Sequence, residues 1–244
     1  MSTFPAGSPV PSPDAGPVAT GVRLRPAVVL AVALTVVCVL FAGCSAYAVH
    51  ADWSMWALMG RLVADPGAVG DAEPGSGESL FLMASSVQSK ALIVTCAVFF
   101  VWSHLVRANA RVFARGADAP ASGVAVGARF VPLANLRLPN RIAAATWVSS
   151  RPLGADEGFR RFPLTLVNVW WVVFVAARVL AWCGGMGYSL AQGPGAVRHA
   201  VAAMLLGDVL DIVAAVLLPL FVIRLTAMQR ARHAQSPAVP AVRQ

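Results

Sequence analysis

Charged side chains are scarce in this chain. Aspartate, glutamate, lysine and arginine make up 12% of its 244 residues, whereas 58% are hydrophobic. A soluble domain usually carries about 25% charged residues, so the composition excludes an ordinary water-soluble protein and indicates a membrane protein. The net charge of +8 would suit nucleic acid, but the basic residues lie between apolar runs and do not cluster in a soluble module. We therefore expect the lipid bilayer as a partner, and no nucleic acid.

The sequence also lacks the spacings typical of metal and cofactor sites. Its four cysteines, Cys38, Cys44, Cys96 and Cys183, form no CxxC pair and no Cys/His ligand pattern. We expect no metal and no other cofactor. The cysteines are expected to be buried thiols; a disulfide between Cys44 and Cys183 is the alternative, because both fall at a similar depth.

Signatures of catalysis are missing as well. The sequence shows no Ser/His/Asp arrangement, phosphate loop or zinc pattern. Gly207-Asp208 is faintly similar to an intramembrane aspartyl protease motif, but that chemistry needs a second carboxylate that shares a proton. The expected neighbour is Arg178, whose positive charge favours the ionised carboxylate and opposes general-acid work. We predict that the chain is not an enzyme.

Four apolar segments are long enough to cross a bilayer, which takes about 20 residues. In the second segment Gln88 and Lys90 leave an uninterrupted apolar core of only 91–106. Backbone polar groups cannot remain unpaired in hydrocarbon, so all four segments should be helices. We predict an all-α membrane protein with one transmembrane domain, 26–226, whose four transmembrane helices span about 26–47, 80–106, 162–188 and 201–223.

The distribution of arginine predicts the orientation. Fifteen of the nineteen basic residues lie before the first span, between the second and third spans, or after the fourth. The connection after the first span is acidic, with Asp52, Asp65, Asp71, Glu73 and Glu78 among its residues. The positive-inside rule then places both termini and the connection 107–161 in the cytoplasm, in a multi-pass protein of the cell (inner) membrane.

The regions outside the spans are rich in residues that break regular structure. The sequence predicts a disordered Pro/Gly/Ser-rich tail over 1–25, a flexible acidic external loop over 64–79 and a basic tail over 227–244. Trp53, Trp56 and Met59 are expected to continue the first helix at the level of the lipid headgroups.

The first span has a second interpretation. Arg23 and Arg25, an apolar stretch and then Ala42-Gly43-Cys44 resemble a lipoprotein signal with its cysteine. The alternative, which we favour, is that Ala42, Gly43 and Ala46 ease close packing between helices.

The connection between the second and third spans carries the most specific pattern. Its elements are W-x-H, R-x-N-A, A-V-G and F-V-P-x-A-N-L-x-x-P. This order resembles the domain of unknown function 4328 family, multi-pass membrane proteins found widely in actinobacteria, over roughly residues 80–230. The resemblance implies an architecture and supplies no catalytic residues. The motif residues are Trp102, His104, Arg107, Asn109, Ala110, Gly127, Phe130, Pro132, Asn135, Leu136, Pro139 and Trp147.

Part of this connection should lie on the membrane surface. Pro132 and Pro139 interrupt a helix, and apolar residues alternate with arginines over 125–150. We predict a broken amphipathic segment at the cytoplasmic interface, where Arg129, Arg137 and Arg141 are candidates to bind anionic lipid headgroups. Packing of this segment against the helices is the alternative.

Three charged residues fall inside the third and fourth spans. Arg178 lies near the middle of the third span, and Asp208 and Asp211 lie in the fourth at a similar depth. An unpaired charge there costs about 2.5–3.5 kcal/mol on insertion scales, so an Arg–Asp cluster is expected. The cluster either fixes the packing of the two helices, which we favour, or serves proton relay or substrate binding.

Two classes of function remain at this point. One is a non-catalytic scaffold or accessory membrane subunit with a membrane protein partner. The other is a small oligomeric transporter or lipid-binding protein that uses the Arg–Asp cluster. No paired broken-helix pattern of inverted repeats is present, which favours the first class.

Overall fold

The computed structural model describes residues 24–70, 72–114 and 157–235. Within them it contains α1 (Leu24–Ala64), the short 3₁₀ helix η1 (Pro66–Ala68), α2 (Glu73–Ala114), α4 (Glu157–Ser189) and α5 (Pro194–Gln235), and no strand. All four α-helices are long and apolar enough to cross a membrane. The prediction of an all-α protein with four candidate spans is confirmed.

The helices are longer than a bilayer requires. α1, α2 and α5 have 41, 42 and 42 residues, which at about 1.5 Å per residue is roughly twice the ~30 Å of hydrocarbon. α1 continues through Trp53, Trp56 and Met59 to Ala64 without a break. α2 already begins at Glu73, so only the first part of the predicted loop 64–79 is a connection.

The predicted amphipathic segment lies outside the described residues. The same holds for the motif residues Gly127, Phe130, Pro132, Asn135, Leu136, Pro139 and Trp147, and for Arg129, Arg137 and Arg141.

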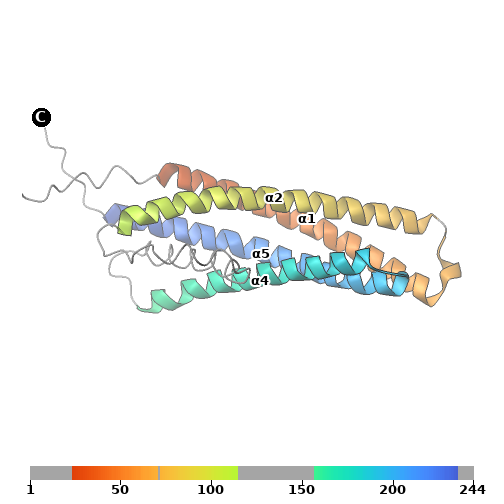
Figure 1. Cartoon of the computed structure of the whole chain (residues 1–244). Coiled ribbons are helices and arrows are strands. Elements are labelled where there is room, and N and C mark those ends of the chain that lie inside the picture. The colour runs from red at the N-terminus through yellow and green to blue at the C-terminus, as the bar shows by residue number, and fades with distance from the viewer. Residues whose placement is uncertain (1–23, 71, 115–156, 236–244) are drawn as a thin grey trace, which may run out of the picture.

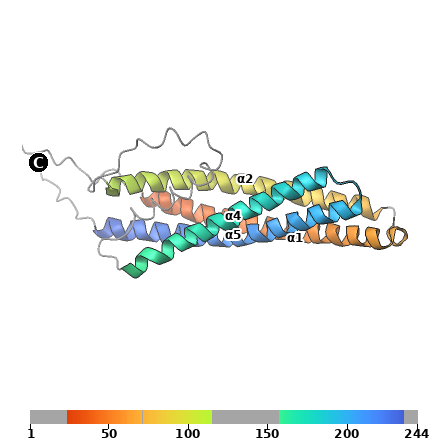
Figure 2. The same cartoon turned by 60° about the horizontal axis from the view of Figure 1, so that its bottom comes forward.

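The four helices do not form a square bundle. α1 packs between α2 and α5, and α5 packs between α1 and α4, whereas the backbones of α2 and α5 come close at few points. The order across the molecule is therefore α2, α1, α5, α4. The turn between α1 and α2 projects beyond the turn between α4 and α5 at the same end (Figures 1 and 2), and α4 crosses α5 obliquely (Figure 2).

Glycine sets the approach of α4 to α5. A Cβ atom on Gly184 would lie 2.4 Å from Met204 Cγ and 2.9 Å from the backbone oxygen of Ala200. A Cβ atom on Gly207 would meet the backbone oxygen of Ala177 at 3.2 Å. Such small residues let helix backbones pack closely. At Gly43, by contrast, a Cβ atom would meet nothing within 4 Å, so the predicted close packing at this glycine is wrong.

The turn between α4 and α5 also depends on glycine. Gly193 has a φ of 104°, a left-handed conformation that other residues rarely adopt. Pro194 follows as the first residue of α5, where its missing N–H has no helical partner to lose. The turn thus reverses the chain within a few residues and holds α4 beside α5.

Two large hydrophobic cores lie along the described bundle, with a small cluster of Ala48, Ala51 and Ala84 besides them. We call the one near the chain tails the tail-side core; it includes Leu34, Trp102, Trp170, Phe221 and Leu225. The turn-side core lies near the two turns and consists of Met55, Leu58, Met59, Phe81 and Val201. The polar residues described next lie between these cores.

Candidate functional site

A buried polar layer draws side chains from all four helices. We use this name for Ser45 and Asp52 of α1, Gln88 of α2, Arg178 of α4, and Asp208 and Asp211 of α5. The three carboxylates are almost closed to the outside: Asp52 is 2%, Asp208 7% and Asp211 0% exposed. Burial of this kind is costly unless the groups bind one another.

Gln88 is the centre of the contacts. Its Nε2 donates to Asp208 Oδ1 at 2.8 Å and lies 3.3 Å from Ser45 Oγ and 3.4 Å from Asp211 Oδ2. Arg178 donates from Nη2 to Asp211 Oδ2 and forms an ion pair with it. The amide therefore links α2 to α1 and α5, and the ion pair links α4 to α5.

A third link joins α1 to α5. The carboxyl groups of Asp52 and Asp208 lie close enough to interact electrostatically. Two ionised carboxylates at close range repel each other, so a proton on one of them would lower the cost of burying the pair.

The layer is not balanced in charge. Three carboxyl groups face the single guanidinium of Arg178, which packs 5.9 Å from the centre of the Phe174 ring. Asp52 Oδ2, Asp211 Oδ1 and Arg178 Nε are buried and have no hydrogen-bond partner within the described part of the chain. Nor is any group of three or more His, Cys, Asp or Glu side chains there arranged to hold a metal ion.

The polar layer lies where the apolar stretches end. α1 has no Asp, Glu, Lys or Arg from Pro26 to Ala51, and Asp52 is the first that follows. On α2 the exposed side chain of Lys90 comes two residues after Gln88. Lysine reaches water or headgroups from such a position with its long stem. The layer is therefore near the turn-side boundary of the apolar belt.

The sequence predicted part of this site. Arg178 and Asp211 form the expected ion pair, whereas Asp208 accepts a hydrogen bond from Gln88 and lies near Asp52. The sequence predicts Asp52 in the acidic connection, because a first span of about 20 residues ends before it. The signal that remained was Gln88, a polar residue inside the second span.

The cysteines differ from the expectation. All four are free; Cys38 is buried, Cys44 and Cys96 are partly exposed and Cys183 is exposed. The predicted burial holds only for Cys38, and the alternative disulfide between Cys44 and Cys183 is not formed. A lipid-facing thiol such as Cys183 needs no polar partner, because its apolar character suits hydrocarbon.

The described motif residues form a packing face at the end of α2. Trp102, Val106 and Asn109 are buried at helical spacing, whereas His104 is exposed and Arg107 partly so. The Trp102 ring meets the Phe221 ring edge-on at 5.9 Å, and Gln229 Nε2 donates to the Val106 carbonyl at 3.0 Å. Of Ala110 only the place in α2 is described.

The family comparison agrees with this architecture. The model of the domain of unknown function DUF4328 matches residues 67–227. The chain belongs to this family. The DUF4328 match includes Gln88, Arg178, Asp208 and Asp211, but it leaves out α1 with Ser45 and Asp52. No curated protein and no solved structure matches the chain.

Proposed function

We propose that this DUF4328 protein is a non-catalytic accessory or scaffold subunit of the cell membrane, with both termini in the cytoplasm. The observation that carries the proposal is the polar layer. Its groups come from all four helices and bind mainly one another, and its three carboxyl groups are closed to substrates by burial. The contacts of this layer fix how the four helices pack. Fixed packing gives the bundle a stable outer surface, which a membrane protein partner needs for binding.

The test combines abundance with partner binding. The amount of protein in the membrane should fall to a similar degree in Arg178→Ala, Asp208→Ala and Asp211→Ala, because each substitution breaks contacts of the polar layer. The isosteric variants Asp208→Asn and Asp211→Asn are the matched controls and should keep more protein. A membrane protein should co-purify with the gently solubilised wild type in fixed ratio, and its own abundance should fall when this chain is deleted. A partner abundance that is independent of this chain contradicts the accessory role.

A second candidate is a small oligomeric transporter or lipid-binding protein. The specific observation in its favour is the excess of carboxyl groups over guanidinium in the polar layer, where Asp52 and Asp208 lie close enough to interact. Intramembrane carboxylates of this kind serve proton relays in other proteins. This function predicts that Asp52→Asn and Asp208→Asn remain folded but abolish proton flux in reconstituted vesicles. Vesicles without flux, for wild type and variants alike, exclude it.

The proposed orientation has its own test. The excess of arginine in the tails and in 107–161 supports cytoplasmic termini. Reporter fusions at residues 20, 120 and 235 should be cytoplasmic, and those at 70 and 195 external. An external reporter at residue 120 would reverse the whole topology.

The proposed lipid partner is tested with the segment 125–150. Its arginines are expected to bind anionic headgroups, each contributing about 1 kcal/mol near the surface. Substitution of Arg129, Arg137 and Arg141 by Gln in the full chain should weaken its retention of anionic lipid, and added salt should do the same. Retention that is independent of lipid charge would point to packing of this segment on protein.

A further inference from the structure

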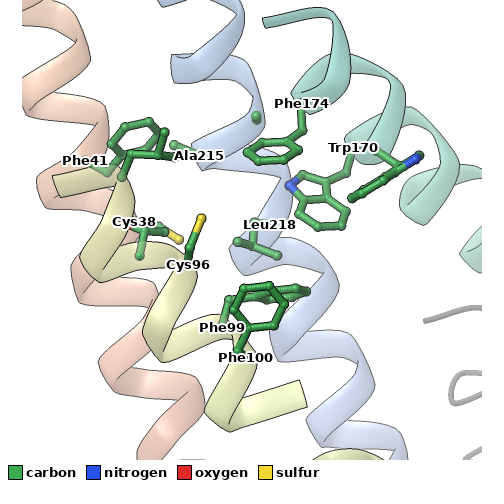
Figure 3. A pocket seen from close by; sticks show the side chains of 13 residues that line it. Cys38, Phe41, Cys96, Phe99, Phe100, Trp170, Phe174, Ala215 and Leu218 are labelled. Carbon is green, nitrogen blue, oxygen red and sulfur yellow. The ribbon is translucent and has the colours of Figure 1, made fainter. Parts of the chain in front are cut away.

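A groove runs along the bundle between α2 and α4. Its walls come from these two helices and its floor from α1 and α5, which pack against each other. Figure 3 shows Phe99 and Phe100 of α2 below, Phe174 and Trp170 of α4 at the upper right, Leu218 of α5 between them and Cys38 of α1 at the left. The cavity has a volume of about 130 Å³.

The lining of the groove is apolar. Thr95 carries the one hydroxyl group in this lining, and that hydroxyl donates a hydrogen bond to the Ala91 carbonyl at 2.8 Å. Aromatic rings make up much of the two walls. The groove narrows where Phe99 of one wall meets Trp170 of the other, with ring centres 5.4 Å apart. Nothing in this lining fixes a charged or hydrogen-bonding ligand.

The groove opens to the surface of the bundle inside the candidate membrane spans. Phe100, which lines it, is 66% exposed. All four helices that line it are apolar enough to cross a membrane, so the medium at its mouth is lipid hydrocarbon. An empty groove there would forfeit dispersion contacts along its walls.

The size of the groove selects the occupant. A volume of about 130 Å³ has no room for a helix, which is about 10 Å across with its side chains. The volume is also below the roughly 300–1,000 Å³ of pockets for drug-sized ligands. A stretch of one flexible hydrocarbon chain is thinner than either and fits this space, while the rest of that acyl chain stays in the bilayer.

We propose that the groove between α2 and α4 is a lipid site that holds one acyl chain of a bilayer phospholipid. The chain enters from the side, past Phe100, and lies against the rings of Trp171 and Phe174. Because the lining carries no charge, the headgroup contributes little and phospholipids of different headgroup charge bind alike. The site is independent of the proposed accessory role, since it needs only the described bundle.

The test uses phospholipids that carry a photoreactive diazirine in the middle of one acyl chain. The full-length protein is reconstituted with such lipids of zwitterionic or anionic headgroup, exchanged exhaustively into detergent, illuminated and mapped by peptide mass spectrometry. Adducts should persist at Cys96 and Trp171 after the exchange and fall at least fivefold at Val36, an exposed residue of α1 outside the groove. Equal loss at all three residues overturns the proposal, as does retention that requires an anionic headgroup.

Matched variants test whether the acyl chain lies inside the groove. Ala215→Phe fills it from the floor, whereas Val216→Phe adds the same ring one residue away, on a side chain that is 56% exposed. Adducts at Cys96 and Trp171 should fall at least fivefold in Ala215→Phe and stay within twofold in Val216→Phe. Cys96→Phe, from the α2 wall, should repeat the loss at Trp171 if Ala215→Phe does not fold. Unchanged adducts in a folded filling variant overturn the proposal, and the wild-type arm decides it without any variant.

Discussion

The tail-side and turn-side cores are built from different side chains. Rings from three helices meet in the tail-side core, where Trp102 and Trp170 approach Phe221 with ring centres 5.9 and 6.4 Å apart. The turn-side core has two flexible methionines, Met55 and Met59, and a smaller set of rings, in which Phe81 meets Tyr188 with centres 5.1 Å apart. Rigid rings specify one packing arrangement, whereas methionine adapts to irregular gaps.

The two cores also differ in their contact with polar groups. At the turn side, the Arg198 guanidinium lies 4.1 Å from the centre of the Trp56 ring, and the Tyr188 hydroxyl lies 3.3 Å from Glu78 Oε1. Aromatic residues with polar tips and nearby charges are typical of the region where a membrane meets water. The difference predicts that the polar layer separates a half of the bundle that lies in hydrocarbon from a half that reaches the interface.

The largest effect is expected from the polar layer that divides the cores. Arg178→Leu leaves Asp211 buried without its cation and should lower the free energy of unfolding by about 3–5 kcal/mol. Combining Arg178→Leu with Asp208→Asn and Asp211→Asn removes the stranded charges and should recover at least half of that loss. Thermal unfolding in detergent measures both. A triple variant less stable than the single one would show that the ion pair does not hold the layer together.

The sequence predicts the helices of this bundle more completely than its polar layer. Runs of about 20 apolar residues reveal a span by composition alone, and Arg178 and Asp211 stand out inside such runs. Asp52 could not be placed in the same way, because a helix of 41 residues continues beyond the predicted span and carries this residue back into the bundle. Nor does periodicity show which helices are neighbours, so the groove between α2 and α4 had no sequence signal.

The next effect compares the cores with one chemical change. Leu58→Ala in the turn-side core should cost about 4 kcal/mol. Unfolding exposes Leu58 to water or headgroups, so the substitution loses both the transfer free energy of the side chain and its packing contacts. Leu34→Ala in the tail-side core should cost about 2 kcal/mol, because lipid is as apolar as leucine and only the cavity remains. Both residues are buried, at 5% and 0% exposure. The free energies of unfolding are compared in the same bilayer discs; equal losses would place both cores in hydrocarbon.

A smaller effect is expected where a polar side chain enters the tail-side core. Gln229 is buried, and its amide donates to the Val106 carbonyl of α2. Gln229→Met keeps much of the volume and removes this donor, so it should cost about 1 kcal/mol, the usual net value of such a bond. Thr226→Val, which removes a hydrogen bond to Val222 within α5, is the matched control and should cost less. A Gln229→Met loss above about 3 kcal/mol would give this core a polar anchor comparable to the polar layer.

The smallest effect belongs to the surface of the turn side. Arg61 and Glu73 form an ion pair with 2.6 Å between Nη2 and Oε2, but their side chains are 54% and 45% exposed. Water and salt screen such a pair, and its two long side chains lose freedom in forming it, so exposed pairs typically contribute between about 0 and 1 kcal/mol. Glu73→Gln should therefore shift thermal unfolding by no more than a degree or two, and added salt should abolish the shift. A loss comparable to that of Leu58→Ala, insensitive to salt, would show that this pair is shielded from water and that the boundary of the membrane lies beyond the turn between α1 and α2.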